Sequence, residues 1–246
     1  MRAVQQTYNL DEKLQQHRSH PTSDIVPRAM IRPEALSYQL LRPNAAGPAD
    51  MALLGEAYRC WSTVWAETLL ELDNVKKVAS DDFTRQDEIG AIFHEWECIG
   101  MTSYRWVDLS SAIDRSDSYF SVWPADALDS AAAYGSKVCL CSNLTVAAPW
   151  RRAGGYSVKE MLLALAVERF KQTDGDALLG TPRNDKGMNE LGYRLGFRPL
   201  HHGVAHHGVE IDLVAFYRNS CARLSLAPAT ESVIQALLPR NEEEAK

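Results

Sequence analysis

The sequence lacks the features that mark membrane and secreted proteins. It has no uninterrupted apolar stretch long enough to span a bilayer, and its polar N-terminus lacks the apolar core of a signal peptide. Its five cysteines form an odd set without a CxxC pair, which favours a reduced protein over a disulfide framework. We therefore expect a cytoplasmic protein with no membrane span.

Positive charge is also scarce. The 26 lysines and arginines are outnumbered by 32 aspartates and glutamates, which gives a formal net charge of −6. A chain of this charge does not offer a basic face along a duplex, so we expect no nucleic-acid partner. Apolar residues make up 46% of the 246 residues, which suits one large domain or two small ones.

The distribution of polar and patterned segments divides the chain into three parts. Residues 1–34 are polar and interrupted by prolines, which is typical of an arm with at most a short helix. Residues 35–220 carry the segments of a folded domain. Residues 221–246 form a tail with room for one helix before its acidic end.

Within the predicted domain, strands and helices alternate. Residues 89–94 and 98–109 read as a hairpin, and the other expected strands are 35–42, 137–146, a short one within 174–182, 198–204 and 210–217. In the strand 137–146, Cys139, Cys141 and Asn143 should share one face. Apolar periodicity predicts helices at 158–171 and before Gly196.

A long helix should follow Asp50, which we expect to cap it. Its apolar residues recur at steps of three and four, which builds one face of Leu54, Tyr58, Trp61, Trp65, Leu69 and Leu72. Core packing explains such a face, and lining a pocket for a lipid-like substrate is the alternative.

The stretch WRRAGGYS, residues 150–157, lies between a strand and the helix 158–171. Glycines let the backbone approach a ligand closely, and the first turn of a helix has free N–H groups that suit an anion. Arg151 and Arg152 add positive charge beside them. An ordinary loop is the alternative, because an arginine-glycine turn before a helix is common.

This order of elements and three short motifs resemble the GNAT superfamily of acyltransferases. Arg152, Gly155 and Ser157 match its diphosphate-binding signature, except that Ser157 stands where glycine or alanine is usual. Two further landmarks are similar to LTV at 144–146 and YRLGF at 193–197, so that the resemblance covers about residues 137–217. It implies an α/β (α+β) GNAT fold: a central mixed, mostly antiparallel sheet flanked by helices, with an N-terminal arm and a C-terminal helical tail.

The resemblance also implies a co-substrate, acyl-CoA or acyl-phosphopantetheine, and no metal. The backbone N–H of Val146 would face the thioester carbonyl, and Asn184 lies one residue from the family's usual contact to the pantetheine arm. The donor-binding residues that the resemblance implies are Leu144, Val146, Arg151, Arg152, Ala153, Gly154, Gly155, Tyr156, Ser157 and Asn184.

The usual acid and base of the family are displaced in this sequence. Leu140 stands at the position of the family's usual acidic base. Glu97 is therefore our candidate base, with Glu95 and Asp108 as alternatives. Each of these carboxylates could also be a solvated surface group, which is the simpler interpretation. Gly192 stands at the position of the usual tyrosine acid, and Tyr193 follows one place later. A helix turns by about 100° per residue, so Tyr193 need not point to the same spot.

Two further groups have less specific patterns. His201, His202, His206 and His207 lack the spacing of a metal site, and a polar hairpin or an acceptor-pocket base explains them as well. Cys139 and Cys141 lie near the expected thioester, but a buried strand cysteine is their simpler role.

The resemblance implies an N-acyltransferase that acts on a small-molecule or amino-acid amine, with an acyl carrier protein as a possible partner. The layout is more weakly similar to the bacterial long-chain N-acyl amino acid synthases and their autoinducer-synthase relatives. An acetyl-CoA-dependent N-acetyltransferase and a non-catalytic acyl-CoA-binding module are the alternatives. The sequence gives neither the oligomeric state nor the acceptor.

Overall fold

The computed structural model describes residues 29–75, 77–151, 153, 155–219 and 226–238. Seven strands form one sheet in the order β1-β2-β3-β4-β5-β7-β6. The pair β4 and β5 is parallel and every other neighbouring pair is antiparallel. The expected class, a mixed and mostly antiparallel sheet flanked by helices, is confirmed.

The strands follow the alternating apolar segments of the sequence. The hairpin of β2 and β3 is present as predicted, and β4 has the predicted bounds. The strands are β1 (Leu36–Leu41), β2 (Glu88–His94), β3 (Glu97–Asp108), β4 (Lys137–Val146), β5 (Ala177–Gly180), β6 (Arg198–His206) and β7 (Val209–Tyr217).

The helices include one correction and three additions: the sequence analysis expected no helix at 81–84, 112–115 or 125–132, because segments this short show little helical periodicity. The long helix begins at Pro48 after Gly47, so Asp50 lies in its first turn and does not cap it; proline fits the first helical position because its fixed φ suits a helix and it has no N–H to satisfy. The helices are α2 (Pro48–Asp73), α3 (Asp81–Thr84), α4 (Ala112–Arg115), α5 (Ala125–Ala132), α6 (Val158–Lys171), α7 (Met188–Arg194) and α8 (Pro228–Leu237).

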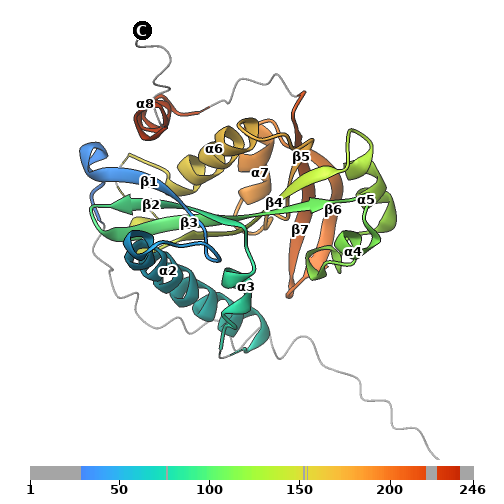
Figure 1. Ribbon diagram of the computed structural model, residues 1–246, viewed down its shortest axis with the longest axis horizontal. Coiled ribbons are helices and arrows are strands. Elements are labelled where there is room, and N and C mark those ends of the chain that lie inside the picture. Colours follow the sequence, from blue (N-terminus) through green and yellow to red (C-terminus); the bar gives the residue numbers. More distant parts are fainter. Residues whose placement is uncertain (1–28, 76, 152, 154, 220–225, 239–246) are drawn as a thin grey trace, which may run out of the picture.

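Helices cover both faces of the sheet. In Figure 1, α2 and α3 lie on one side, and α6, α7 and α8 lie on the other. The last helix, α8, packs on α6 and β1, and Val233 and Ile234 are buried there. There the Thr230 hydroxyl donates to the buried Glu160 carboxylate at 3.0 Å. The helix predicted for the tail thus closes one side of the core.

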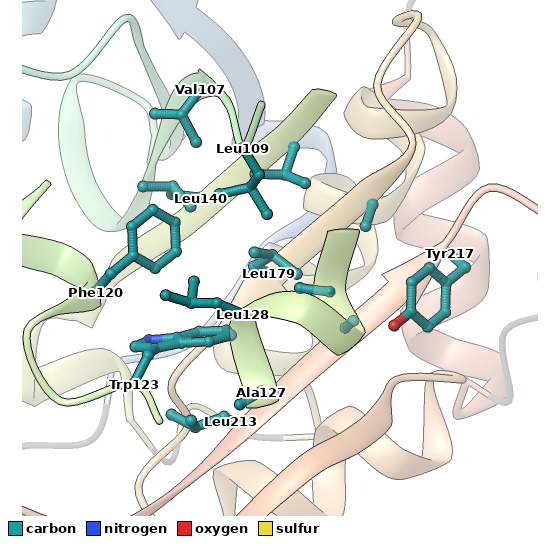
Figure 2. Close-up of a cluster of buried hydrophobic side chains, with 14 of the residues drawn as sticks. Val107, Leu109, Phe120, Trp123, Ala127, Leu128, Leu140, Leu179, Leu213 and Tyr217 are labelled. Carbon is teal, nitrogen blue, oxygen red and sulfur yellow. The ribbon is translucent and has the colours of Figure 1, made fainter. Parts of the chain in front are cut away.

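The α2 stripe is mainly a packing surface. Trp61 is 1% exposed, and its ring packs with those of Tyr58 and Phe83. A second apolar cluster lies beside α5, where Figure 2 shows Phe120 and Trp123 gathered with strand residues. The contacts of Trp61, Tyr58 and Phe83 support the core-packing interpretation of the α2 face.

Candidate functional site

An opening forms where the two parallel strands separate. The pairing of β4 with β5 ends at Leu140, which lies opposite Leu179. Beyond β5 the chain follows β7, and the backbone N–H of Asp212 donates to the carbonyl of Pro182 at 3.1 Å. β4 instead continues along β3 to Val146. The last part of β4 therefore has no β5 residue beside it.

The β4 edge presents backbone groups to this opening. The N–H of Ala147 donates to the carbonyl of Ile99 at 3.0 Å, on the β3 side. Because successive N–H groups of a strand point in opposite directions, those of Val146 and Leu144 point to the open side. The carbonyl of Val146 faces the same way, since it accepts a hydrogen bond from Nε of Arg151 at 3.1 Å.

The turn after β4 leads into the N-terminus of α6. Ser157 caps the helix, and its hydroxyl accepts a hydrogen bond from the N–H of Glu160 at 3.3 Å. Gly155 has a φ of 84°, and no other atom lies within 4 Å of where its Cβ would be. Ala153 is buried and Tyr156 packs beside it in the same cluster. Arg152 and Gly154, two of the predicted phosphate-binding residues, lie outside the described residues.

A bulge in β4 changes the predicted direction of Asn143. The register slips between Met101 and Ser103 of β3, and Asn143 has a left-handed φ of 55°. Its amide donates to the Ser103 hydroxyl at 3.2 Å, on the α2 side of the sheet. Cys139 and Cys141 point to the α6 side instead. The expectation that all three share one face is wrong, because strand alternation does not hold through a bulge.

The α2 side of the opening carries polar contacts. The indole N–H of Trp65 donates to the Thr145 hydroxyl at 3.0 Å, which ties α2 to the β4 edge. Nearby, the hydroxyls of Ser103 and Ser142 lie 2.9 Å apart. These side chains provide hydrogen-bonding groups on the α2 side of the opening.

A buried carboxylate organises the opposite wall. Asp212 of β7 is 2% exposed, and its carboxylate accepts hydrogen bonds from the amide of Asn184 at 3.0 Å, the amide of Asn189 at 3.1 Å and the N–H of Gly203 at 2.9 Å. The hydroxyl of Tyr193 also donates to it. Two predicted site residues, Asn184 and Tyr193, are thus brought together by a residue that the sequence analysis did not single out.

The electrostatics of this cluster disfavour Tyr193 as an acid. Burial of Asp212 acts to raise its pKa, but the hydrogen bonds from Tyr193, Gly203, Asn184 and Asn189 outweigh burial and hold the pKa well below its ordinary value. Burial and the hydrogen bond to Asp212 raise the pKa of Tyr193. A phenol held by a carboxylate gives up its proton reluctantly.

This wall lies next to the start of α6. Nζ of Lys159, in the first turn of α6, donates to the carbonyl of Lys186 at 3.3 Å. Arg194 of α7 lies 3.7 Å from the carboxylate of Glu160. The segment that carries Asn184 and α7 therefore borders the same helix end as the turn after β4.

The three candidate bases are separated in space. Glu97 begins β3, is exposed, and accepts a hydrogen bond from the indole of Trp150 at 2.9 Å. Glu95 pairs with Arg32 at the tip of the hairpin. Asp108 ends β3, about 36 Å from Glu97 along an extended strand. Hydrogen bonds from Ser136 and Ser110 lower the pKa of Asp108 to about 2, which makes it a poor base.

Leu140 and Gly192, which stand where the family usually has its base and its acid, have no group that can take or give a proton. Leu140 is 2% exposed and belongs to the apolar cluster beside α5. Gly192 is buried in α7, where an added Cβ would lie 3.7 Å from the side chain of Phe197. Both positions serve packing.

The histidines do not gather at one point. His202 lies 3.2 Å from the carboxylate of Asp212, whereas His207 pairs with Asp73 at the end of α2. Among the described residues, no group of three or more His, Cys, Asp or Glu side chains could hold a metal ion.

Burial also makes the two β4 cysteines unreactive. Burial raises the pKa of Cys139 and raises that of Cys141 to about 11, so both thiols are neutral near pH 7.

Asp212 was the functional candidate that sequence reasoning missed. Its signal is visible afterwards: it is the one charged residue in the apolar run 211–217. A carboxylate buried in such a strand requires partners, because an unpaired buried charge is strongly unfavourable.

Comparison with solved structures identifies the fold. The chain is similar to FeeM, an N-acyl amino acid synthase from uncultured soil microbes, with a TM-score of 0.51, 14% identity, and coverage of 74% of this chain and 90% of that chain. It is similar to the AHL synthase LasI, with a TM-score of 0.54, 13% identity, and coverage of 84% of this chain and 98% of that chain. It is also similar to a mosquito arylalkylamine N-acetyltransferase like 5b, with a TM-score of 0.55, 13% identity, and coverage of 74% of this chain and 99% of that chain.

These likenesses, together with the separation of β4 and β5, show that the chain has the GNAT fold. No protein-family model matches the sequence, and no curated protein matches it significantly. No helix among the described residues is long and apolar enough to cross a membrane.

Proposed function

We propose that the chain is an N-acyltransferase. It transfers an acyl group from the thioester of acyl-CoA or an acyl carrier protein to the amine of a small molecule or an amino acid. One observation carries the proposal: β4 and β5 separate, so that the N–H of Val146 faces an opening bordered by the N-terminus of α6. The likeness to an N-acyl amino acid synthase and an AHL synthase supports it.

The turn and the first turn of α6 bind the phosphate groups of the donor. Free N–H groups and the helix dipole favour an anion at this end of the helix. The absence of a side chain at Gly155 leaves room for the anion to approach the backbone. Arg151 and Arg152 supply positive charge near it, and Arg151 releases the carbonyl of Val146 when the pantetheine arm binds along the β4 edge.

The reaction needs a neutral amine and an electrophilic carbonyl. The amine nitrogen attacks the thioester carbon, and the N–H of Val146 stabilises the resulting oxyanion. Collapse of this intermediate forms the amide bond, breaks the carbon–sulfur bond and releases a thiolate. The proton that the amine loses balances the proton that the thiolate gains. A thiolate is a good leaving group near neutral pH, so the reaction does not require Tyr193 as a strong acid.

The acceptor amine enters beside α2. A cavity of about 180 Å³ lies between α2 and the segment Ala147–Pro149, directly after the β4 edge. Its lining includes the carboxylates of Glu56, Glu67 and Glu97 and the guanidinium of Arg59, which pairs with Glu56. The remaining negative charge attracts an amine in its ammonium form. Glu97 is the base that we propose for the deprotonation of this amine.

The experiment measures thiol release from acetyl-, octanoyl- and palmitoyl-CoA and from the matching acyl carrier proteins, with pooled amino acids and polyamines as acceptors. Release that requires an acceptor supports the proposal. Release from long chains indicates a synthase of N-acyl amino acids, whereas release from acetyl-CoA alone indicates an N-acetyltransferase. Saturable donor binding without release under any acceptor would instead identify a binding module and overturn the proposed activity.

Two variants of one residue test the phosphate role of the turn. Asparagine and aspartate both tolerate a left-handed φ and differ in charge, so Gly155→Asn controls for the loss of glycine in Gly155→Asp. We expect donor affinity to fall by roughly 10-fold or more in Gly155→Asp relative to Gly155→Asn, because the added charge repels phosphate. Equal affinities would contradict phosphate binding at this turn.

A further inference from the structure

The Asp212 cluster fixes the orientation of two side-chain amides. An ionised carboxylate only accepts hydrogen bonds, so the amides of Asn184 and Asn189 must both present their NH₂ groups to it. The lowered pKa of Asp212 keeps the carboxylate ionised at neutral pH. Both amide oxygens therefore point away from Asp212.

These two oxygens lack partners. Oδ1 of Asn184 and Oδ1 of Asn189 are buried, and neither has a hydrogen-bond partner within the described ranges of the chain. A buried acceptor without a partner costs free energy, so such atoms mark a place that a donor group fills. Two acceptors whose amides are held by one carboxylate match a ligand with N–H groups.

The cluster borders the opening on the side opposite β4. Asn184 lies on the segment that leaves β5, with its N–H bonded to the carbonyl of Glu210 at 3.0 Å. Asn189 lies in the first turn of α7. The contact of Lys159 with Lys186 holds this segment against the start of α6. A chain-like ligand that runs from the α6 turn into the opening passes this wall.

We propose that Asp212 is a positioning residue, which fixes Asn184 and Asn189 as a pair of acceptors for the amide N–H groups of the pantetheine arm. This inference rests on the proposed function, because that arm is the part of the donor with two secondary amides. Asp212 does not touch the donor; it sets which atom each amide presents.

The test compares binding of two ligands to the full chain by calorimetry. One is CoA, and the other is 3′-phospho-ADP, which keeps the phosphates and lacks the pantetheine arm. In Asp212→Asn the new amide offers a donor where a carboxylate accepted, so at least one neighbouring amide loses its orientation. We expect CoA affinity to fall by roughly 10-fold and the affinity for 3′-phospho-ADP to stay within about 2-fold.

Two further variants keep the test decisive. His202→Gln is the matched control, because His202 lies on the exposed side of Asp212 and the four donors remain; we expect CoA affinity within about 2-fold of the parent. If Asp212→Asn does not fold, Asn189→Ser removes one acceptor and leaves Asp212 with its other donors. It should weaken CoA and spare 3′-phospho-ADP.

The outcomes separate this inference from the proposed function. Selective loss of CoA affinity supports the positioning role. Equal changes for both ligands, or no change for either, overturn it and leave the proposed function standing. If the unaltered chain binds neither ligand and releases no thiol from any acyl-CoA or acyl carrier protein, the proposed function itself fails and this inference fails with it.

Discussion

The two sides of the opening are built in different ways. On the β4 side, the groups that face the opening belong to the backbone, at Leu144, Val146 and the turn that leads into α6. On the opposite side, side chains from α7 and from the segment after β5, together with the backbone N–H of Gly203 in β6, converge on the single carboxylate of Asp212.

This difference affects how each side responds to substitution. A backbone N–H persists when its side chain changes, so the oxyanion donor at Val146 should survive replacement by residues other than proline. The Asp212 side depends on the charge and shape of one residue. The predictions below test this contrast, from the largest expected effect to the smallest.

Replacement of Asp212 by alanine should have the largest effect. The change leaves the Asn184, Asn189 and Tyr193 donors without their acceptor in a buried place. We expect the free energy of unfolding to fall by about 4 kcal/mol, measured by urea denaturation at pH 7. A loss below about 1 kcal/mol would contradict the view that this carboxylate organises the wall.

The stability lost in Asp212→Ala should also depend on pH. The pKa of Asp212 is lowered in the folded state, so its contribution is present above the unfolded aspartate pKa of about 4 and is lost as the pH falls through the lowered value. The difference in the free energy of unfolding between the parent chain and Asp212→Ala should therefore be constant from about pH 6 to 7. It should become smaller below about pH 4. A difference that widens in acid would contradict the assignment.

Val146 tests the backbone side of the contrast. Val146→Pro removes an N–H that faces the opening and makes no ladder bond, whereas Val146→Ala keeps it. We expect kcat to fall by roughly 100-fold in Val146→Pro, about 3 kcal/mol, because one oxyanion donor is lost. Val146→Ala should stay within about 3-fold, and similar losses in both variants would indicate that the side chain matters instead.

Thr145→Val should have a smaller effect. The replacement keeps the shape and removes the oxygen that accepts from the indole of Trp65 and donates to the carbonyl of Asn143 at 2.7 Å. We expect a loss of about 1.5 kcal/mol in the free energy of unfolding, since the indole N–H is left unpaired. The control Trp65→Phe removes the indole donor and leaves the Thr145 hydroxyl bonded to the carbonyl of Asn143. The double variant should lose less than the sum of the single losses.

Ser157→Ala should have the smallest effect. It removes the side-chain cap of α6, whose oxygen accepts from the N–H of Glu160, and should cost about 1 kcal/mol of stability. Ser157→Gly should cost only a few tenths of a kcal/mol. Donor affinity should change little in either variant, because the N–H groups of the first helical turn remain. A large loss of affinity would show that the hydroxyl itself contacts the donor.

The regular elements were the most predictable part of the fold. β4 and α6 have the bounds that their periodicity predicts, because each buries one face or both along its whole length. The predicted cap at Asp50 and the predicted face of Asn143 were wrong, since a cap and a bulge depend on backbone angles at single residues. The turn of residues 150–157 was found from its glycines and its position before a helix.

The sequence by itself determined the order of the strands and of the helices α2, α6 and α7, and it indicated the turn before α6, because periodicity and glycine placement act over short stretches of chain. Only the tertiary structure decided that β4 and β5 separate after Leu140 and that Asp212 meets Asn184, Asn189 and Tyr193. The separation of the two strands and the contacts of Asp212 depend on the tertiary structure for the same physical reason. These contacts join residues far apart in the chain, and their geometry is set when helices from both faces pack on the sheet.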